Sequence, residues 1–148
     1  MKILLASDSH GHDEYLKKIV NKHNDCDIYL HLGDSQSNKE GIYPFISVRG
    51  NCDYFRSDFS RFLNFFTPFG KLYAEHIPFH QISLSELKEK GFKVYLCGHT
   101  HIKKYEIRDG VHIINPGSLA YPRDDKESYA ILELTKDQIN VEFFSLFS

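Results

Sequence analysis

The chain has no tryptophan, one methionine and only three cysteines among its 148 residues. Because Cys26, Cys52 and Cys97 form no CxxC pair, the sequence favours neither a thiolate zinc site nor a disulfide framework, and a reduced, cytoplasmic setting is the simpler interpretation. No apolar run approaches the length of a membrane span. The first predicted strand begins at residue 2, so we expect no signal peptide and no membrane partner.

An excess of charge of one sign is also lacking, since the net charge is −2. We therefore expect no stable nucleic-acid partner, and an anionic substrate would have to be held by local charge in a site. The hydrophobic content of 41% and the charged content of 26% are typical of a globular protein. The length predicts one domain over residues 1–148.

Four short apolar runs each end in a turn that carries Asp, Asn or His. The runs cover residues 3–6, 28–32, 45–48 and 94–97. The turns that follow them contain Asp8 and His10, Gly33-Asp34, Gly50-Asn51-Cys52-Asp53, and Gly98-His99-Thr100-His101. Open α/β sheets place their sites beyond the carboxyl ends of their strands. We therefore expect these polar side chains to lie close together.

The remaining segments predict a mixed sheet system with helices outside. Helical spacing indicates a helix that ends near Asn24, and a capping-box pattern at Ser83 begins a second, shorter one. Hairpins are predicted around Phe69-Gly70-Lys71, Arg108-Asp109-Gly110 and Lys136-Asp137. The phenylalanines of residues 55–69 are expected to belong mostly to the core, and an exposed part of them would suit an oligomer interface or an apolar substrate wall.

Seven strand-end side chains form a candidate metal-ligand set: Asp8, His10, Asp34, Asn51, His76, His99 and His101. Nitrogen and oxygen donors suit divalent manganese, iron, zinc or nickel. Seven ligands are too many for one catalytic ion but suit two ions ~3.5–4 Å apart that share a carboxylate. The positive charge of two such ions exceeds the negative charge of two aspartates and a bridging hydroxide. The site would therefore attract a phosphate ester.

These motifs, together with Asn115-Pro116-Gly117-Ser118, resemble the motif series of calcineurin-like metallophosphoesterases. The Gly-Asn-Cys-Asp form and the short chain are similar to the small YfcE-like phosphodiesterase branch. The resemblance runs from Ile3 to about Arg123. It implies a four-layer α/β/β/α sandwich, in which two mixed β-sheets face each other and helices flank them.

The resemblance also implies a metal-dependent phosphodiesterase that acts on a small phosphodiester. Asp8, His10 and His101 would hold the first ion, and Asp34 would bridge to the second. Asn51, His76 and His99 would complete the second ion's ligands. Manganese is the expected metal, with nickel, iron, zinc or magnesium as alternatives. A hydroxide between the ions would attack phosphorus in line with the leaving group.

The sequence departs from the family pattern after His76, where Ile77 stands in place of the usual glycine. His80 is therefore an alternative ligand. Cys52 lies where many larger relatives carry a histidine thought to assist the leaving group. A thiol is a poorer acid near neutral pH, so Cys52 is either a weak catalytic residue or a small buried filler.

The substrate-binding residues also have alternatives. Asn115, Gly117 and Ser118 either contact a substrate phosphate or only shape a loop, and Arg123 is either a phosphate contact or a solvated surface residue. Two further functions compete with a phosphodiesterase. One is a protein-interaction module of the same fold without hydrolysis, and the other is a phosphomonoesterase. A pure scaffold has no need to keep the complete ligand set.

Overall fold

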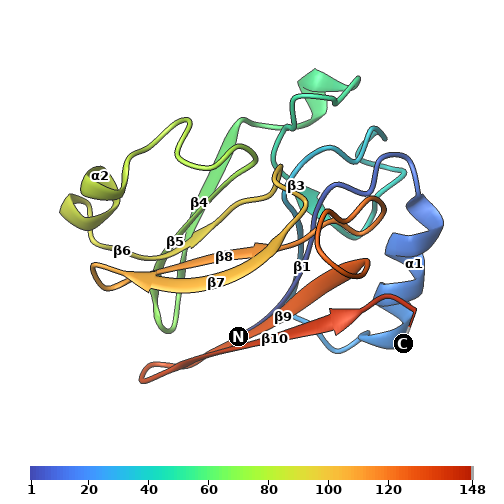
Figure 1. Cartoon of the computed structure of the whole chain (residues 1–148). Coiled ribbons are helices and arrows are strands. Elements are labelled where there is room, and N and C mark those ends of the chain that lie inside the picture. Colours follow the sequence, from blue (N-terminus) through green and yellow to red (C-terminus); the bar gives the residue numbers. More distant parts are fainter. Residues whose placement is uncertain (148) are drawn as a thin grey trace.

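The computed structural model describes residues 1–147 and contains two five-stranded mixed sheets (Figure 1). The first sheet has the order β10-β9-β1-β2-β3. Its strands are β1 (Lys2–Ala6), β2 (Ile28–His31), β3 (Ile46–Ser47), β9 (Ser128–Leu134) and β10 (Ile139–Ser145). The second sheet has the order β4-β5-β6-β8-β7. Its strands are β4 (Phe62–Thr67), β5 (Gly70–Glu75), β6 (Phe92–Leu96), β7 (Lys103–Arg108) and β8 (Val111–Pro116).

Strand β1 shows why the first sheet is buried on both faces. Ile3 and Leu5 point into the core between the two sheets, and their exposed fraction is 0%. Leu4 and Ala6, on the other face, belong to the cluster that contains Leu16 and Ile19 of helix α1 (Asp13–Lys22). A strand covered on both sides has to be apolar at every position, which explains the continuous run in the sequence.

The second sheet repeats this arrangement around β6. Val94 and Leu96 join the core between the sheets, whereas Tyr95 packs outward with Leu87 of helix α2 (Leu84–Glu89). The predicted capping box at Ser83 begins α2. Figure 1 shows α1 and α2 on opposite sides of the two sheets, so the predicted four-layer α/β/β/α class is confirmed, with thin helical layers. Neither helix is long and apolar enough to cross a membrane, and the same holds for every helix within residues 1–147.

The prediction that the Phe-rich segment belongs mostly to the core was wrong for part of it. Phe59 is buried, but the exposed fractions of Phe62 and Phe66 are 44% and 77%. Both lie on β4, an edge strand whose alternate side chains point away from the core. Phe62 covers one of its ring faces by stacking on Tyr73, with the ring centroids 5.4 Å apart.

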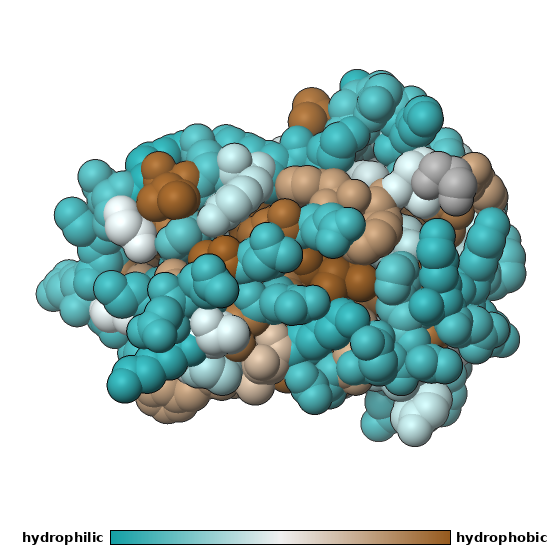
Figure 2. Space-filling view, turned by 90° about the horizontal axis from the view of Figure 1, so that it is seen from below, coloured by the Kyte–Doolittle hydropathy of each residue, from teal (hydrophilic) through white to brown (hydrophobic). Residues whose placement is uncertain are grey.

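Parallel pairing gathers the loops that carry the candidate ligands. Strand β1 pairs in parallel with β2 and β2 with β3, while β5 pairs in parallel with β6. Within each sheet the carboxyl ends of these strands therefore lie at the same edge. Figure 2 views the molecule from below and shows apolar side chains gathered along the middle of that face, surrounded by hydrophilic ones. The candidate ligands follow the carboxyl ends of the parallel strands.

Candidate metal centre

Asp8, His10 and His101 form the first of two metal-ligating groups. Their ligand atoms all lie within 4.8 Å of one another. Asp8 Oδ1 is 3.2 Å from His101 Nε2 and 3.8 Å from His10 Nε2. Within residues 1–147, Asp8 Oδ1 and His10 Nε2 are the buried side-chain atoms that lack a hydrogen-bond partner. Because leaving a buried polar atom unpaired costs about 1–3 kcal/mol, these converging atoms fit the ligands of a cation.

Asp34, His76 and His99 form the second group. His76 Nε2 lies 3.2 Å from Asp34 Oδ2 and 3.9 Å from Asp8 Oδ1, so this ring connects the two groups. Asn51 Oδ1 is 2.9 Å from His76 Nε2 and 3.1 Å from His99 Nδ1. The structure thus brings together all seven side chains that the sequence selected, from five separate strand ends.

Backbone carbonyls orient two of the imidazole rings. His76 Nδ1 donates to the carbonyl of Leu32 and His101 Nδ1 donates to the carbonyl of Tyr121, each at 2.6 Å. A carbonyl can only accept, so Nδ1 carries a proton in each ring, and Nε2 of the neutral ring presents its lone pair to the site. Outer partners of this kind fix the tautomer and orientation of metal-binding histidines.

Gln36 and Asp53 support the ligands, and sequence reasoning missed both. Gln36 Oε1 is 2.8 Å from Nδ1 of His10. The buried Asp53 carboxylate accepts hydrogen bonds from the backbone N–H groups of Gln36 at 2.9 Å, Asp34 at 3.2 Å and Gly50 at 2.6 Å. It therefore fastens the loop after β2 to the loop after β3. Asp53 ends the Gly-Asn-Cys-Asp motif, which was a usable signal, whereas no motif marked Gln36.

The backbone of the site is unusual because five of the seven candidate ligands have positive φ. The values are 54° for Asp8, 44° for His10, 60° for Asp34, 70° for His99 and 62° for His101. Asp, Asn and His tolerate this left-handed region better than most residues, but such conformations concentrate at functional sites. Close approach also demands glycine at position 50, where a Cβ would lie 2.0 Å from Asp34 Oδ1.

The charges of the site favour ionised carboxylates. Burial opposes ionisation of Asp34, but the hydrogen bond and charge of His76 and the N–H of Cys52 outweigh it and lower the pKa to about 2. Burial likewise opposes ionisation of Asp8, whose pKa is still lowered by His101, His76 and Ser7. Both aspartates are therefore anionic near neutral pH and suited to a divalent cation.

Three of the predicted substrate-binding residues make contacts that hold the loops of the site in place. Asn115 donates to the carbonyl of Gly98 at 3.0 Å, and Ser118 Oγ donates to the carbonyl of Asp8 at 2.9 Å. A Cβ on Gly117 would meet the Ser128 side chain at 2.2 Å. These contacts account for the motif by loop geometry alone, and contact with a substrate stays a prediction.

Arg123, the fourth predicted substrate-binding residue, is exposed, and its backbone N–H donates to the carbonyl of His101 at 2.8 Å. Its predicted phosphate contact is not tested by this geometry.

Two alternatives from the sequence can now be compared with the geometry. The structure places His76 beside Asp34 and His99, whereas His80 is exposed in the wall of a neighbouring pocket. Cys52 is exposed, so the proposal that it is a buried filler was wrong. Its backbone N–H donates to Asp34 Oδ1 at 2.8 Å.

Comparison with known proteins gives relatives that are described as phosphoesterases or phosphodiesterases. Residues 1–137 match the calcineurin-like phosphoesterase superfamily domain. The probable metallophosphoesterase YsnB of Bacillus subtilis is 37% identical, covering 97% of this chain and 90% of its own. The solved structure of YfcE, a phosphoesterase from E. coli, has a TM-score of 0.74 at 20% identity and covers 99% of this chain and 100% of its own. An archaeal phosphodiesterase has a TM-score of 0.75 at 25% identity and covers 97% of this chain and 100% of its own.

Two facing mixed sheets carry paired carboxylate and imidazole groups at their loop edge. Together with the family model and the 37% identical relative, they identify a metal-dependent phosphoesterase. The chain belongs to the calcineurin-like phosphoesterase superfamily. The predicted family and fold class are confirmed, and divalent metal ions follow from the family and fit the two ligand groups.

Proposed function

We propose that the chain is a phosphodiesterase that uses two divalent ions, with manganese as the expected metal. The observation that carries this proposal is the pair of ligand groups, Asp8-His10-His101 and Asp34-His76-His99, which lie next to each other. When bound, such ions lower the pKa of water to supply a nucleophile and offset the charge that develops on phosphorus.

Each residue of the chain has a separate task in this proposal. Asp8, His10 and His101 would hold one ion. Asp34 would be shared by both ions, and its Oδ1 is kept in place by the backbone N–H of Cys52. Asn51, His76 and His99 would hold the other ion, and the Asn51 oxygen lies within hydrogen-bond distance of both rings. Fixing these side chains before the substrate arrives avoids reorganisation during the reaction.

Three observations favour a small phosphodiester over the alternatives. The archaeal structural neighbour is described as a phosphodiesterase. The leaving-group position holds an exposed thiol, Cys52, rather than an imidazole, which suits a substrate whose leaving group departs without a strong acid. The complete ligand set argues against an interaction module that has lost hydrolysis, because such a module would gain nothing from buried, unpartnered Asp8 Oδ1.

The test pairs metal analysis with two substrates. Purified protein is reconstituted with manganese, its metal content is measured, and the hydrolysis of bis(p-nitrophenyl) phosphate is compared with that of p-nitrophenyl phosphate. We expect two ions per chain, faster turnover of the diester, loss of activity with chelator and recovery with manganese. One ion or none after full reconstitution would overturn the two-metal assignment. Faster turnover of the monoester would instead identify a phosphomonoesterase.

A further inference from the structure

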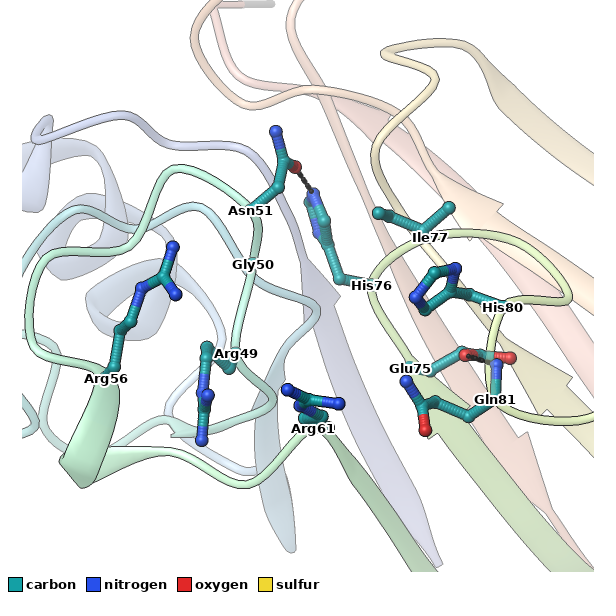
Figure 3. Close-up of a pocket in the computed structure, with 10 residues that line it drawn as sticks. All are labelled: Arg49, Gly50, Asn51, Arg56, Arg61, Glu75, His76, Ile77, His80 and Gln81. Carbon is teal, nitrogen blue, oxygen red and sulfur yellow. Dashed lines mark hydrogen bonds between the residues drawn. The ribbon is translucent and has the colours of Figure 1, made fainter.

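A pocket of about 210 Å³ opens directly beside the metal centre (Figure 3). It lies between the loop that follows β3 and the loop that follows β5. Asn51 and His76 line the pocket and also belong to the metal centre. The pocket and the metal centre therefore adjoin each other along these two side chains.

Three arginines, Arg49, Arg56 and Arg61, line one side of this pocket. In Figure 3 they stand opposite the segment that carries His80 and Gln81. Within residues 1–147, none of the three guanidinium groups forms an ion pair with a carboxylate. This clustering of positive charge occurs in a chain whose net charge is −2.

The pocket does contain one carboxylate, that of Glu75, but its oxygens are already engaged. Glu75 is buried, and it accepts a hydrogen bond from the Tyr95 hydroxyl at 2.7 Å and another from the Gln81 N–H at 2.8 Å. Glu75 thus holds the loop after β5 rather than pairing with an arginine.

A structural role explains only one of the arginines. Arg49 Nε donates to the carbonyl of Phe59 at 3.3 Å and so helps to hold its loop. Arg56 and Arg61 are exposed, and their guanidinium groups make no hydrogen bond to any residue in the described part of the chain. Three guanidinium groups on one pocket wall make that wall positive, so it would attract an anion.

We propose that this pocket binds a second phosphate group of the substrate, so that the enzyme selects phosphodiesters that carry a further phosphate. The inference rests on the proposed function, since the reacting phosphate lies at the metal centre. Arg56 and Arg61 are the specificity-determining residues, because a planar guanidinium can donate two parallel hydrogen bonds to one phosphate. Arg49 adds charge from the pocket wall.

Equilibrium binding tests the pocket without relying on catalysis. Manganese-loaded protein is titrated by calorimetry with thymidine 5′-monophosphate and with thymidine 3′,5′-bisphosphate, which differ only in the second phosphate. Inorganic phosphate and pyrophosphate repeat the comparison with a shorter spacing. We expect the doubly phosphorylated ligand of at least one pair to bind about 10-fold more tightly or better. The double variant Arg56→Gln/Arg61→Gln should bring that ratio close to one.

Arg108→Gln is the matched control, because it removes an arginine that lies on β7 outside the pocket and pairs with Glu106. It should keep the wild-type ratio. Equal affinities within both ligand pairs, or an unchanged ratio in the double variant with its fold confirmed by circular dichroism, would overturn the proposal.

Hydrolysis separates this proposal from the proposed function. The substrates are the 5′-(p-nitrophenyl phosphate) of thymidine with and without a 3′-phosphate. If neither is hydrolysed while the binding preference holds, the phosphodiesterase assignment fails and the pocket stands. If both are hydrolysed with the same KM and the paired ligands bind equally, the assignment stands and the pocket proposal fails.

Discussion

The metal centre and the arginine pocket share Asn51 and His76, yet their charged side chains are held in opposite ways. At the metal centre, carbonyls and amides fix the imidazoles, and the Asp8 carboxylate is buried. In the pocket, Arg56 and Arg61 are exposed and lack protein partners within residues 1–147. If both proposals hold, the protein fixes the groups that act on phosphorus and leaves free the groups that select what is attached to it.

Asp34→Asn, at the metal centre, is expected to have the largest effect on activity. If Asp34 bridges both ions, the change harms both of them and should lower kcat by more than about 10²-fold, since even outer-shell changes cost about 10–100-fold. His101→Ala should cost less because His101 belongs to one group only. Rates with p-nitrophenyl diesters, together with circular dichroism of each variant, measure the effect. Near-wild-type turnover in folded Asp34→Asn would refute the bridging role.

Replacing His76 and His80 separately distinguishes the fixed centre from the free pocket. His76→Ala should lower the occupancy of one ion strongly, because His76 lies beside Asp34. His80→Ala, four residues further on and exposed, should keep both ions bound. Metal content after reconstitution gives the answer. Loss of an ion in His80→Ala but not in His76→Ala would reverse the assignment, and loss in neither would mean that the seventh ligand is another residue.

Gln36 provides an intermediate test, because it acts only through His10. Gln36→Leu removes the oxygen next to His10 Nδ1 and should lower metal affinity by about 10–100-fold. Gln36→Glu keeps an acceptor at that position and should restore most of the affinity. Competition with a fluorescent chelator measures both constants. Equal affinities in the leucine variant and the wild type would show that the ring needs no support from Gln36.

The smallest effect is expected for Cys52, which is exposed and follows Asn51 in the chain. Cys52→Ala should change turnover little, and wild-type rates should depend steeply on the pKa of the leaving group. A positioned general acid supplies about 10²–10⁴-fold, and neither region offers an obvious one. Cys52→His is measured with the same series of substrates, and faster turnover of poor leaving groups would show that an imidazole reaches them.

A series of diesters with graded phenols measures this dependence, once chemistry is known to limit the rate. A flat dependence in the wild type, or a hundredfold loss in Cys52→Ala with both ions bound, would show that Cys52 or another residue supplies a proton.

The grouping of the candidate ligands could be predicted from the sequence because every one of them follows a recognisable strand end. Asp8 after β1 and His99 after β6 follow short apolar runs, and the two facing sheets bring these strand ends together. The capping box at Ser83 is similarly local. Each of these features depends on residues within one short segment.

The supporting contacts and the pocket could not be predicted in this way. Gln36 meets His10 across 26 positions of the chain, and no local pattern records that distance. Arg56 lies in the short 3₁₀ helix η1 (Arg56–Asp58), and Arg61 lies just before β4. The many phenylalanines of this segment fit neither the helical nor the strand periodicity, so its structure could not be predicted. Which side chains of β4 are exposed depends on the position of this strand at the edge of the sheet, and only the fold determines that position.

The left-handed backbone at Asp8, Asp34 and His99 has a consequence for protein engineering. Glycine or asparagine would relax each of these positions, so a library screened for thermal tolerance alone should drift towards them and discard the chemistry. A screen has to include metal retention to keep the aspartates and histidines. For the same reason, transplanting the side chains onto another scaffold should fail unless the loops that impose their dihedral angles travel with them.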